Sequence, residues 1–317
     1  VMSQTGGGCR ATNYNAFIRK ALKDAGFEQV PVISFNFVGM EKNPGFKLSL
    51  GMLERMLKSI IYGDLLQKLL TKNRAYEVHK GDTQKLYEEW LEKAKGYVKK
   101  SSFKQFKKSI YEMVDAFEKI EVDMSVQKPR VGVVGEVLIK YHPFGNNYVA
   151  DVLEREGAEV VLPDFMGFVK FMATHKTTFN TLLKTNKTSS KVARILIKLI
   201  ALAKSNRNYL PPCDIWHLED KVKDVLSIGN QTGEGWFLTA EMIEYIENDI
   251  PNIICVQPFA CLPNHVVGKG VIKSLRKAYP ESNIVAIDYD PGASEVNQLN
   301  RIKLMLSTAN KNLNPKK

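Results

Sequence analysis

The stretch "RVGVVGEVLI", Arg130–Ile139, decides the fold. It is a short β-branched apolar run that breaks at Gly135 and Glu136, and a strand buried on both faces has this composition. Two similar runs follow, "NIICVQPF" at 252–259 and "SNIVAIDYD" at 282–290, each flanked by helical patterns. Continuous apolar strands that alternate with helices predict a parallel sheet covered by helices on both faces.

With "EVVLPD" at 159–164 the sheet has four expected strands. We therefore predict an α/β fold in which residues 128–317 form a Rossmann-like lobe with strand order 2-1-3-4. In such sheets the chemistry lies beyond the carboxyl ends of the strands, near the point where the strand order reverses. This rule selects three loops: "GEVLIKYHPFGNN" (135–147), "QPFACLPNH" (257–265) and "DYDPGASEVNQ" (288–298).

Two other parts precede this lobe. Residues 48–127 carry the helical period and predict a helical layer. Residues 1–47 contain "SQTGGGCRATNY", then a helix over 10–26 that ends at Gly26, then the strand "VPVISFNF". We interpret them as the remnant of a first Rossmann-like lobe, a partial α/β lobe without its leading strand, and the chain as a fragment of a longer polypeptide. A basic helical insert is expected at about 165–208.

Composition limits the function classes. The 317 residues carry a net charge of +11 and include four cysteines without the spacing of a disulfide framework. We see neither a secretory signal nor an apolar run that would span a bilayer, so we expect a cytoplasmic chain without a membrane partner. The positive charge lies mainly in 93–107 and 170–207, without nucleic-acid-reading motifs. We interpret these stretches as solvated faces or contacts with an acidic domain, and expect no nucleic-acid partner.

Several familiar site motifs are missing. The glycines near residue 132 lack the dinucleotide spacing, "VVGKGV" is too short for a Walker loop, and no G-x-S-x-G is present. A zinc site can be drawn from Cys213, His217, Cys261 and His265, although zinc fingers use other spacings.

Three side chains are candidates for acid–base chemistry. Glu136 follows a strand end, and Glu234 lies in "GEGW", so either can face the cleft as an acid, a base or a ligand-orienting group. The alternative for both is a helix N-cap or a loop hydrogen bond. His142 is either a proton donor or a solvated loop histidine.

Two long stretches carry a family resemblance. "QTGGGCRATNYNAFIRKAL" (4–22) and "QPFACLPNHVVGKGVIKSLRKAYPESNIVAIDYDPGASEVNQLNRIKLML" (257–306) resemble the C-terminal, dehydratase-like region of fused 2-hydroxyacyl-CoA dehydratase activators. These activase-related proteins come from anaerobic bacteria. The last stretch also resembles, more loosely, the second lobe of the dehydratase subunits.

This resemblance implies a [4Fe–4S] cluster held between two Rossmann-type lobes. Cys9 and Cys261 match ligand positions, Gly7 and Gly8 would let backbone amides approach the sulfides, and Arg10 would raise the cluster's potential. A further ligand would come from upstream, so we expect this fragment alone to lack the cluster. The implied partners are an ATP-hydrolysing activase domain, on the same or another chain, and a CoA ester.

Two function classes stay open. One is an iron–sulfur redox module that receives or passes an ATP-driven electron, and the other is a non-catalytic scaffold that docks an activase and carries vestigial cysteines. Whether the chain is an enzyme stays open as well. We expect Cys9 and Cys261 to face one another across an interlobe cleft, with Cys9 on the more open and more reactive loop.

Overall fold

The computed structural model describes residues 2–3, 9–35, 49–172, 214–290 and 292–313. Its larger sheet is entirely parallel and has the order β4-β3-β5-β6, which is the predicted 2-1-3-4. The α/β, Rossmann-like fold class is therefore confirmed. The four strands are β3 (Arg130–Gly135), β4 (Glu159–Val161), β5 (Asn252–Gln257) and β6 (Asn283–Asp288).

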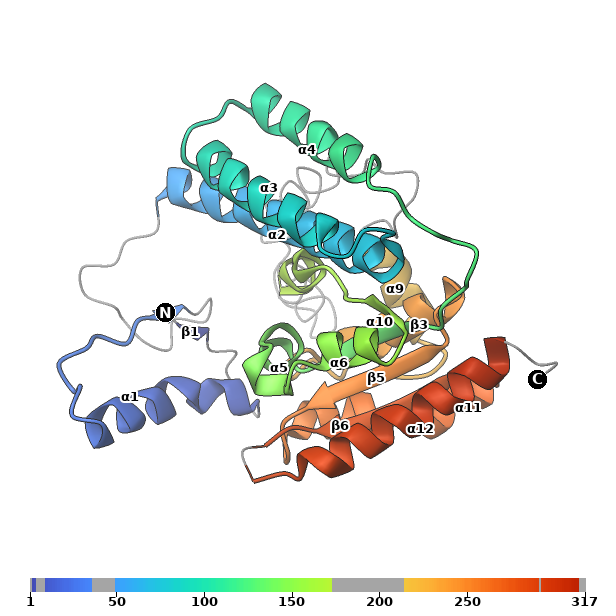
Figure 1. Cartoon of the computed structure of the whole chain (residues 1–317). Coiled ribbons are helices and arrows are strands. Elements are labelled where there is room, and N and C mark those ends of the chain that lie inside the picture. The colour runs from blue at the N-terminus through green and yellow to red at the C-terminus, as the bar shows by residue number, and fades with distance from the viewer. Residues whose placement is uncertain (1, 4–8, 36–48, 173–213, 291, 314–317) are drawn as a thin grey trace.

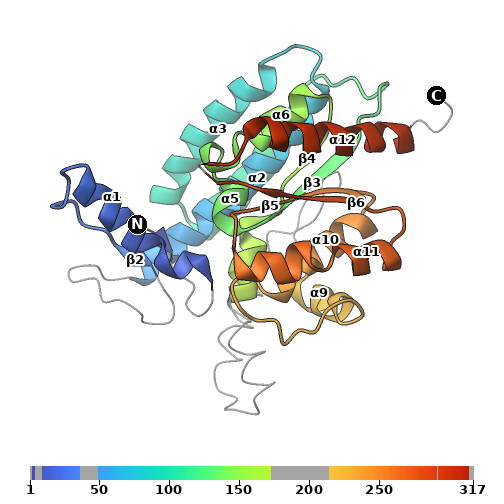
Figure 2. The same ribbon diagram turned by 90° about the horizontal axis from the view of Figure 1, so that it is seen from below.

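Helices cover both faces of this sheet, as Figure 2 shows. Side chains alternate along each strand: in β5, Ile253 and Cys255 enter one apolar cluster and Ile254 and Val256 enter the other. This alternation explains why the strand interiors are apolar without a polar residue at every second position. The first cluster is shared with α9 (Ile215–Val222), α10 (Trp236–Glu247) and α11 (Ile272–Ala278), and the second with α5 (Val137–Tyr141), α6 (Val149–Arg155) and α12 (Glu295–Leu313).

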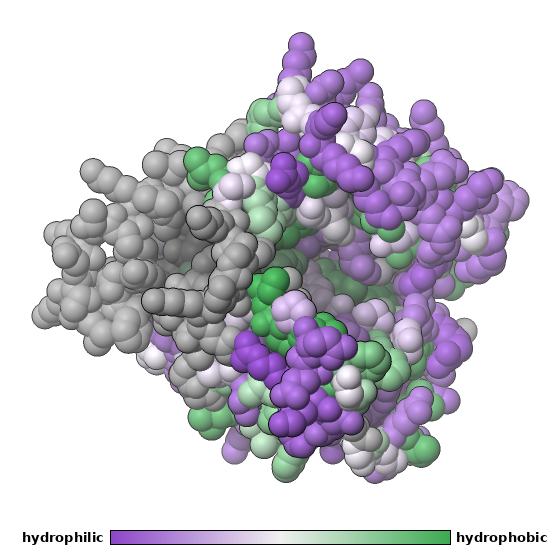
Figure 3. All heavy atoms as spheres, turned by 90° about the vertical axis from the view of Figure 1, so that its left-hand side faces the viewer, coloured by the Kyte–Doolittle hydropathy of each residue, from purple (hydrophilic) through white to green (hydrophobic). Residues whose placement is uncertain are grey.

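The expected helical layer consists of three helices (Figure 1). They are α2 (Leu50–Tyr76), α3 (Asp82–Lys99) and α4 (Phe103–Phe117). Their facing sides bury an apolar cluster of their own that includes Leu69, Trp90 and Met113. Figure 3 shows hydrophilic side chains over this layer and hydrophobic ones gathered in the hollow between the layer and the rest of the molecule.

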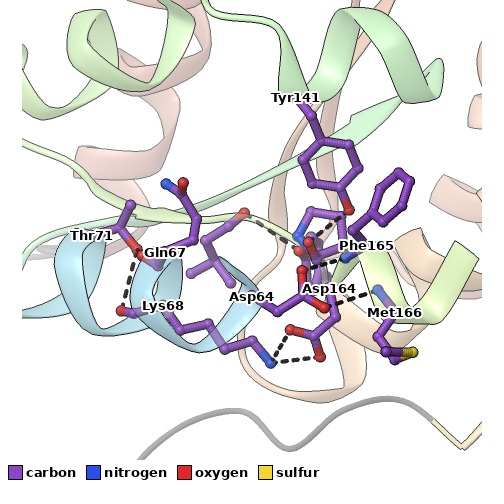
Figure 4. A network of polar contacts seen from close by, with 11 residues as sticks. Asp64, Gln67, Lys68, Thr71, Tyr141, Asp164, Phe165 and Met166 are labelled. Atoms are coloured by element: carbon purple, nitrogen blue, oxygen red, sulfur yellow. Dashed lines mark hydrogen bonds and ion pairs between the residues drawn. The ribbon is translucent and has the colours of Figure 1, made fainter. Parts of the chain in front are cut away.

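A polar network fastens the helical layer to the sheet lobe (Figure 4). Asp64 of α2 accepts hydrogen bonds from the amides of Phe165 and Met166, both at 2.9 Å. One turn further along α2, Lys68 forms an ion pair with Asp164 at 2.7 Å. Because Asp64 and Asp164 are both largely buried, this network fixes how α2 lies against the loop after β4.

The N-terminal part differs from the prediction in one respect. We expected no leading strand, but β1 (Met2–Ser3) pairs in parallel with β2 (Ser34–Phe35), so a two-residue ladder precedes the glycines. That expectation was wrong because so short a pairing leaves no apolar run to recognise. Between the strands lie η1 (Arg10–Asn13) and α1 (Tyr14–Asp24), and Gly26 follows with a φ of +77°, as its predicted role requires.

Residues 165–172 are helical and begin the expected basic insert, while 173–208 lie outside the described residues. Among the described helices, none has the length and apolar character needed to cross a membrane.

Candidate thiol and carboxyl site

The candidate site lies where the strand order reverses, beyond the carboxyl ends of β3 and β5. Glu136 directly follows β3, and Cys261 follows β5 by a few residues. The loop before α10 contributes Glu234, and the turn before η1 contributes Cys9. These four residues make up what we call the thiol–carboxyl site.

Gly135 determines where Glu136 lies. Its φ is +134°, and a Cβ atom added there would lie 1.8 Å from the carbonyl oxygen of Val256. Only glycine therefore lets β3 approach β5 at this point. The next amide, of Glu136, donates a 2.9 Å hydrogen bond to that carbonyl of Val256, so Glu136 is held beside the end of β5.

Two more glycines position Glu234. Gly233 and Gly235 have φ values of +65° and +52°, and a Cβ on Gly235 would lie 2.3 Å from the carbonyl oxygen of Asn230. A Cβ on Gly233 would lie 3.0 Å from Cγ of Pro263. The sequence "GEG" is thus a tight turn that directs one carboxyl group inward, between the loop after β5 and the start of α10.

The two carboxyl groups meet at the first turn of α5. Glu234 Oε1 accepts a hydrogen bond from the amide of Val137, and Glu136 Oε2 accepts one from the amide of Ile139, each at 2.9 Å. The N-cap role left open for Glu136 is therefore correct, but each cap uses only one oxygen. Glu136 Oε1 and Glu234 Oε2 are buried and have no hydrogen-bond partner among the described residues.

Burial and mutual repulsion shift the protonation of this pair. Glu136 and Glu234 are 1% and 3% exposed. Burial raises the pKa of Glu136 to about 8, and the charge of Glu234 adds to the rise. Burial also raises the pKa of Glu234. The nearby cation, Lys140, already binds both oxygens of Glu241 at 2.9 and 3.0 Å.

The two cysteine-bearing segments meet at Gly233. The Cβ position built on this glycine lies 3.4 Å from Cys9 Sγ as well as 3.0 Å from Pro263. Cys9 is buried, as Cys261 is, whereas we expected Cys9 to be the more open of the two thiols. Burial raises the pKa of Cys261 to about 12; the amide of Asn264 opposes this rise, while Glu234, Cys9 and Glu136 add to it.

Arg10 ties the N-terminal segment to the sheet lobe. Its guanidinium donates to the carbonyl oxygen of Phe259 and lies 3.8 Å from Asp290 Oδ1. Asp290 also accepts a hydrogen bond from the amide of Phe259 at 2.7 Å. The loops after β5 and β6 therefore hold the segment that carries Cys9.

Two polar residues of the site were missed by the sequence analysis. Burial raises the pKa of Tyr14, and Glu136 and Cys261 are close enough for their charges to raise it further. Asn264 is fully buried, and both polar atoms of its side chain lack a hydrogen-bond partner. The sequence did offer a signal for both: Tyr14 lies near Cys9 in the stretch 4–22, and Asn264 lies near Cys261 in the stretch 257–306.

The remaining predicted residues fall outside this group. His142 is exposed, and its Nδ1 accepts a hydrogen bond from the amide of Gly145 in η2 (Phe144–Asn146). Cys255 is buried inside β5, which fits a structural role. Gly7, Gly8 and Cys213 lie outside the described residues, so the four-residue zinc pattern cannot be drawn on described residues.

The implied [4Fe–4S] cluster finds only part of its ligand set here. Cys9 and Cys261 are two converging thiols, and the amide of Asn264 donates to the Cys261 sulfur, as amides commonly do to cluster thiolates. Within the described ranges, however, no three His, Cys, Asp or Glu side chains are arranged to hold a metal ion. These residues fit as two ligands of a cluster and do not complete its ligand set.

No protein-family model matches the chain, and comparisons with curated proteins and with solved structures find no match either.

Proposed function

We propose that the chain is part of an iron–sulfur redox module related to 2-hydroxyacyl-CoA dehydratases and their activators. In this proposal Cys9 and Cys261 supply two thiolate ligands of a [4Fe–4S] cluster, and the other ligands come from outside the described residues. An ATP-hydrolysing activase domain, on this or another chain, delivers the electron. The module works in a reducing cytoplasm, where both thiols stay available as ligands.

One observation supports this function most strongly. Segments far apart in the sequence bring two buried thiols together at the switch point of the sheet, beside two carboxyl groups to which no cation of the described residues is bound. A stable core does not need buried polar groups left unpaired, and such groups concentrate at functional sites.

The surrounding residues have distinct roles in this proposal. When bound, the cluster supplies one-electron redox chemistry. Pro263 packs against the Gly233 turn and stiffens the Cys261 loop, and the amide of Asn264 stabilises a thiolate at Cys261. Arg10 holds the Cys9 segment onto the loops after β5 and β6. Tyr14 and the buried apolar surroundings keep water away from the sulfur atoms.

Anaerobic purification followed by iron and sulfide quantification and a visible spectrum tests this function. The protein for this test is the chain together with its activase-bearing polypeptide, because the described residues do not hold a full ligand set. We expect iron and sulfide in the wild type and a loss of most of both in Cys9→Ser and in Cys261→Ser. Cys255→Ser is the matched control, since it is an equally buried thiol of the same lobe, and it should retain the iron.

Iron-free wild-type protein, or equal iron loss in Cys255→Ser and Cys261→Ser, would contradict the proposal. An iron-free protein that still binds the activase would instead support the scaffold function, with Cys9 and Cys261 as vestigial thiols.

A further inference from the structure

The carboxyl pair of the thiol–carboxyl site has no structural task that needs both charges. One oxygen of each carboxyl group caps α5, through the amides of Val137 and Ile139. The second oxygen of each is buried without a partner. A neutral amide side chain would cap the helix equally well, so the second oxygens call for another explanation.

Among the residues that the structure describes, no cation is bound to either carboxyl group of the pair. The titratable groups whose charges act on Glu136 or Glu234 come from four directions: Tyr14 of α1, Lys140 of α5, Glu241 of α10, and the thiols of Cys255 and Cys261 in and after β5. Lys140 is the only cation in this set of described residues, and its ammonium group is bound by both oxygens of Glu241. Two adjacent buried carboxylates without a counter-ion cannot both stay ionised at neutral pH.

We propose that Glu136 and Glu234 share a single proton and form the proton-exchanging pair of the thiol–carboxyl site. One carboxyl group is then a neutral acid and its neighbour a carboxylate, as in other buried carboxyl dyads. This inference deepens the proposed function, on which it rests, by supplying the proton that accompanies an electron.

The proton step is simple to balance. The O–H bond of the neutral carboxyl group breaks, the proton moves to a basic group bound beside Cys261, and the pair is left with two negative charges. Because that state is unfavourable in a buried site, the pair recovers a proton from solvent. In the reverse direction, the pair first loses its proton to solvent and then takes a proton from the bound group.

Asn264 gives an independent reason to expect a polar group bound there. Its side-chain oxygen and nitrogen are both buried without a partner, although its own amide donates to the Cys261 sulfur. A fully buried amide side chain that finds no partner in the protein points to one supplied from elsewhere. The side chain of Asn264 offers one donor group and one acceptor, and the second oxygens of Glu136 and Glu234 offer further hydrogen-bonding atoms. This combination suits a small ligand that carries a hydroxyl or carbonyl group.

The pKa directions agree with this geometry. Burial raises the pKa of Glu136 to about 8 and raises that of Glu234, so one proton stays on the pair through neutral pH.

Carbon-13 NMR of the side-chain carboxyl groups, on the iron-free chain labelled at glutamate, tests the inference. We expect the wild type to hold one proton on the pair at pH 7 and to lose it near pH 8. In Glu136→Gln the remaining Glu234 should titrate at least one pH unit lower than the wild-type pair, because the repelling charge is gone, and the double variant with Glu234→Gln should lose the titration. Glu92→Gln, an exposed carboxyl group on α3, is the control and should leave it unchanged.

Two ionised carboxylates at pH 7 in the wild type would overturn the shared proton. A titration that is unaltered by Glu136→Gln would overturn the pairing. Both results are read on a chain without iron, so they are distinguishable from a failure of the proposed iron–sulfur function.

Discussion

Two pairs of buried charged groups lie in the same lobe and have opposite characters. Lys140 and Glu241 are 3% exposed each and bind one another through two hydrogen bonds. Glu136 and Glu234 are equally buried, but they have like charges and two oxygens without partners. In the first pair the two charges are opposite and hydrogen-bonded to one another, so we call this pair complete and infer that it stabilises the lobe. In the second pair the two charges repel one another and two oxygens lack partners, so we call this pair incomplete and infer that it serves the function of the site.

The sequence spacing of these groups sharpens the contrast. Glu136 and Lys140 are one helical turn apart at α5, a spacing that would let Lys140 pair with Glu136 as well as with Glu241. It lies instead against Glu241 of α10, whose pKa is raised by burial, with Lys140 opposing the rise. The charge of Lys140 opposes the pKa rise at Glu136 and Glu234 as well, but its ammonium group binds Glu241 and not these two carboxyl groups.

Breaking the complete pair should have the largest effect. Lys140→Met leaves Glu241 buried without its cation, so we expect a loss of about 3–5 kcal/mol in the free energy of unfolding, measured with urea. The double variant with Glu241→Leu should recover most of this loss, because apolar groups can replace a buried ion pair. A loss below about 1 kcal/mol in the single variant would mean that the pair does not stabilise the lobe.

The backbone that places Glu136 should be nearly as sensitive. Gly135→Ala introduces a Cβ atom against the carbonyl oxygen of Val256 at a φ of +134°, and we expect it to cost about 3 kcal/mol. Gly96→Ala is the control, since it lies inside α3 with open space around it and should stabilise by about 0.5–1 kcal/mol. Urea unfolding of both variants measures the difference, and a tolerated Gly135→Ala would show that this approach of β3 to β5 is not needed.

Neutralising one member of the incomplete pair should change the pH dependence of stability. The folded-state pKa of Glu136 is raised above its ordinary value of 4.5, to about 8. The folded chain then binds more protons than the unfolded chain between these values, so this group makes stability fall as pH rises through that window. Glu136→Gln should remove up to about 1.4 kcal/mol per pH unit of that slope.

Unfolding curves at several pH values for the wild type and Glu136→Gln measure this slope. The difference between them reports on the Glu136–Glu234 pair, because Asp64 and Glu244, whose pKa values burial raises to about 7 and about 8, contribute equally to both proteins. Parallel curves would show that Glu136 does not hold a proton in the folded chain.

The smallest expected effect concerns the thiol beside the incomplete pair. Negative charge on Glu234 and Glu136 raises the pKa of Cys261 beyond the effect of burial. At pH 9 the wild-type pair carries two negative charges and the Glu136→Gln variant one, so the variant should have the larger thiolate fraction at Cys261 and a few-fold faster alkylation there, followed by mass spectrometry. Cys255 of β5 provides the internal standard, and equal acceleration at both thiols would indicate general loosening instead.

Much of the fold was predictable from local patterns. The strand interiors 131–134, 253–256 and 284–287 carry no polar side chain because each strand packs into two apolar clusters, and that pattern leads directly to a parallel sheet. The order of the sheet followed from its connections. The two-residue ladder of β1 and β2 was missed because two residues are too few to show a strand pattern in the sequence.

The candidate site was predictable only in part. The ends of the predicted strands indicated Glu136 and Cys261, and the two glycines that flank Glu234 indicated a turn. The sequence therefore predicted each of these residues separately. That Glu136 and Glu234 cap the same helix depends on the tertiary approach of two loops, which no local pattern encodes. The burial of Cys9 was missed for the same reason, because its cover comes from the Gly233 turn and the loop after β5.

The central claim is that Cys9 and Cys261 belong to one site, and a reagent for neighbouring thiols tests it most directly. Arsenite is small, uncharged at neutral pH and bridges adjacent thiols, so the reduced chain can be treated with it and weighed by native mass spectrometry. We predict one arsenic atom per chain in the wild type, in Cys213→Ser and in Cys255→Ser, and none in Cys9→Ser or Cys261→Ser. Arsenic binding that survives in Cys9→Ser and Cys261→Ser, or its absence from the wild type, would contradict the account.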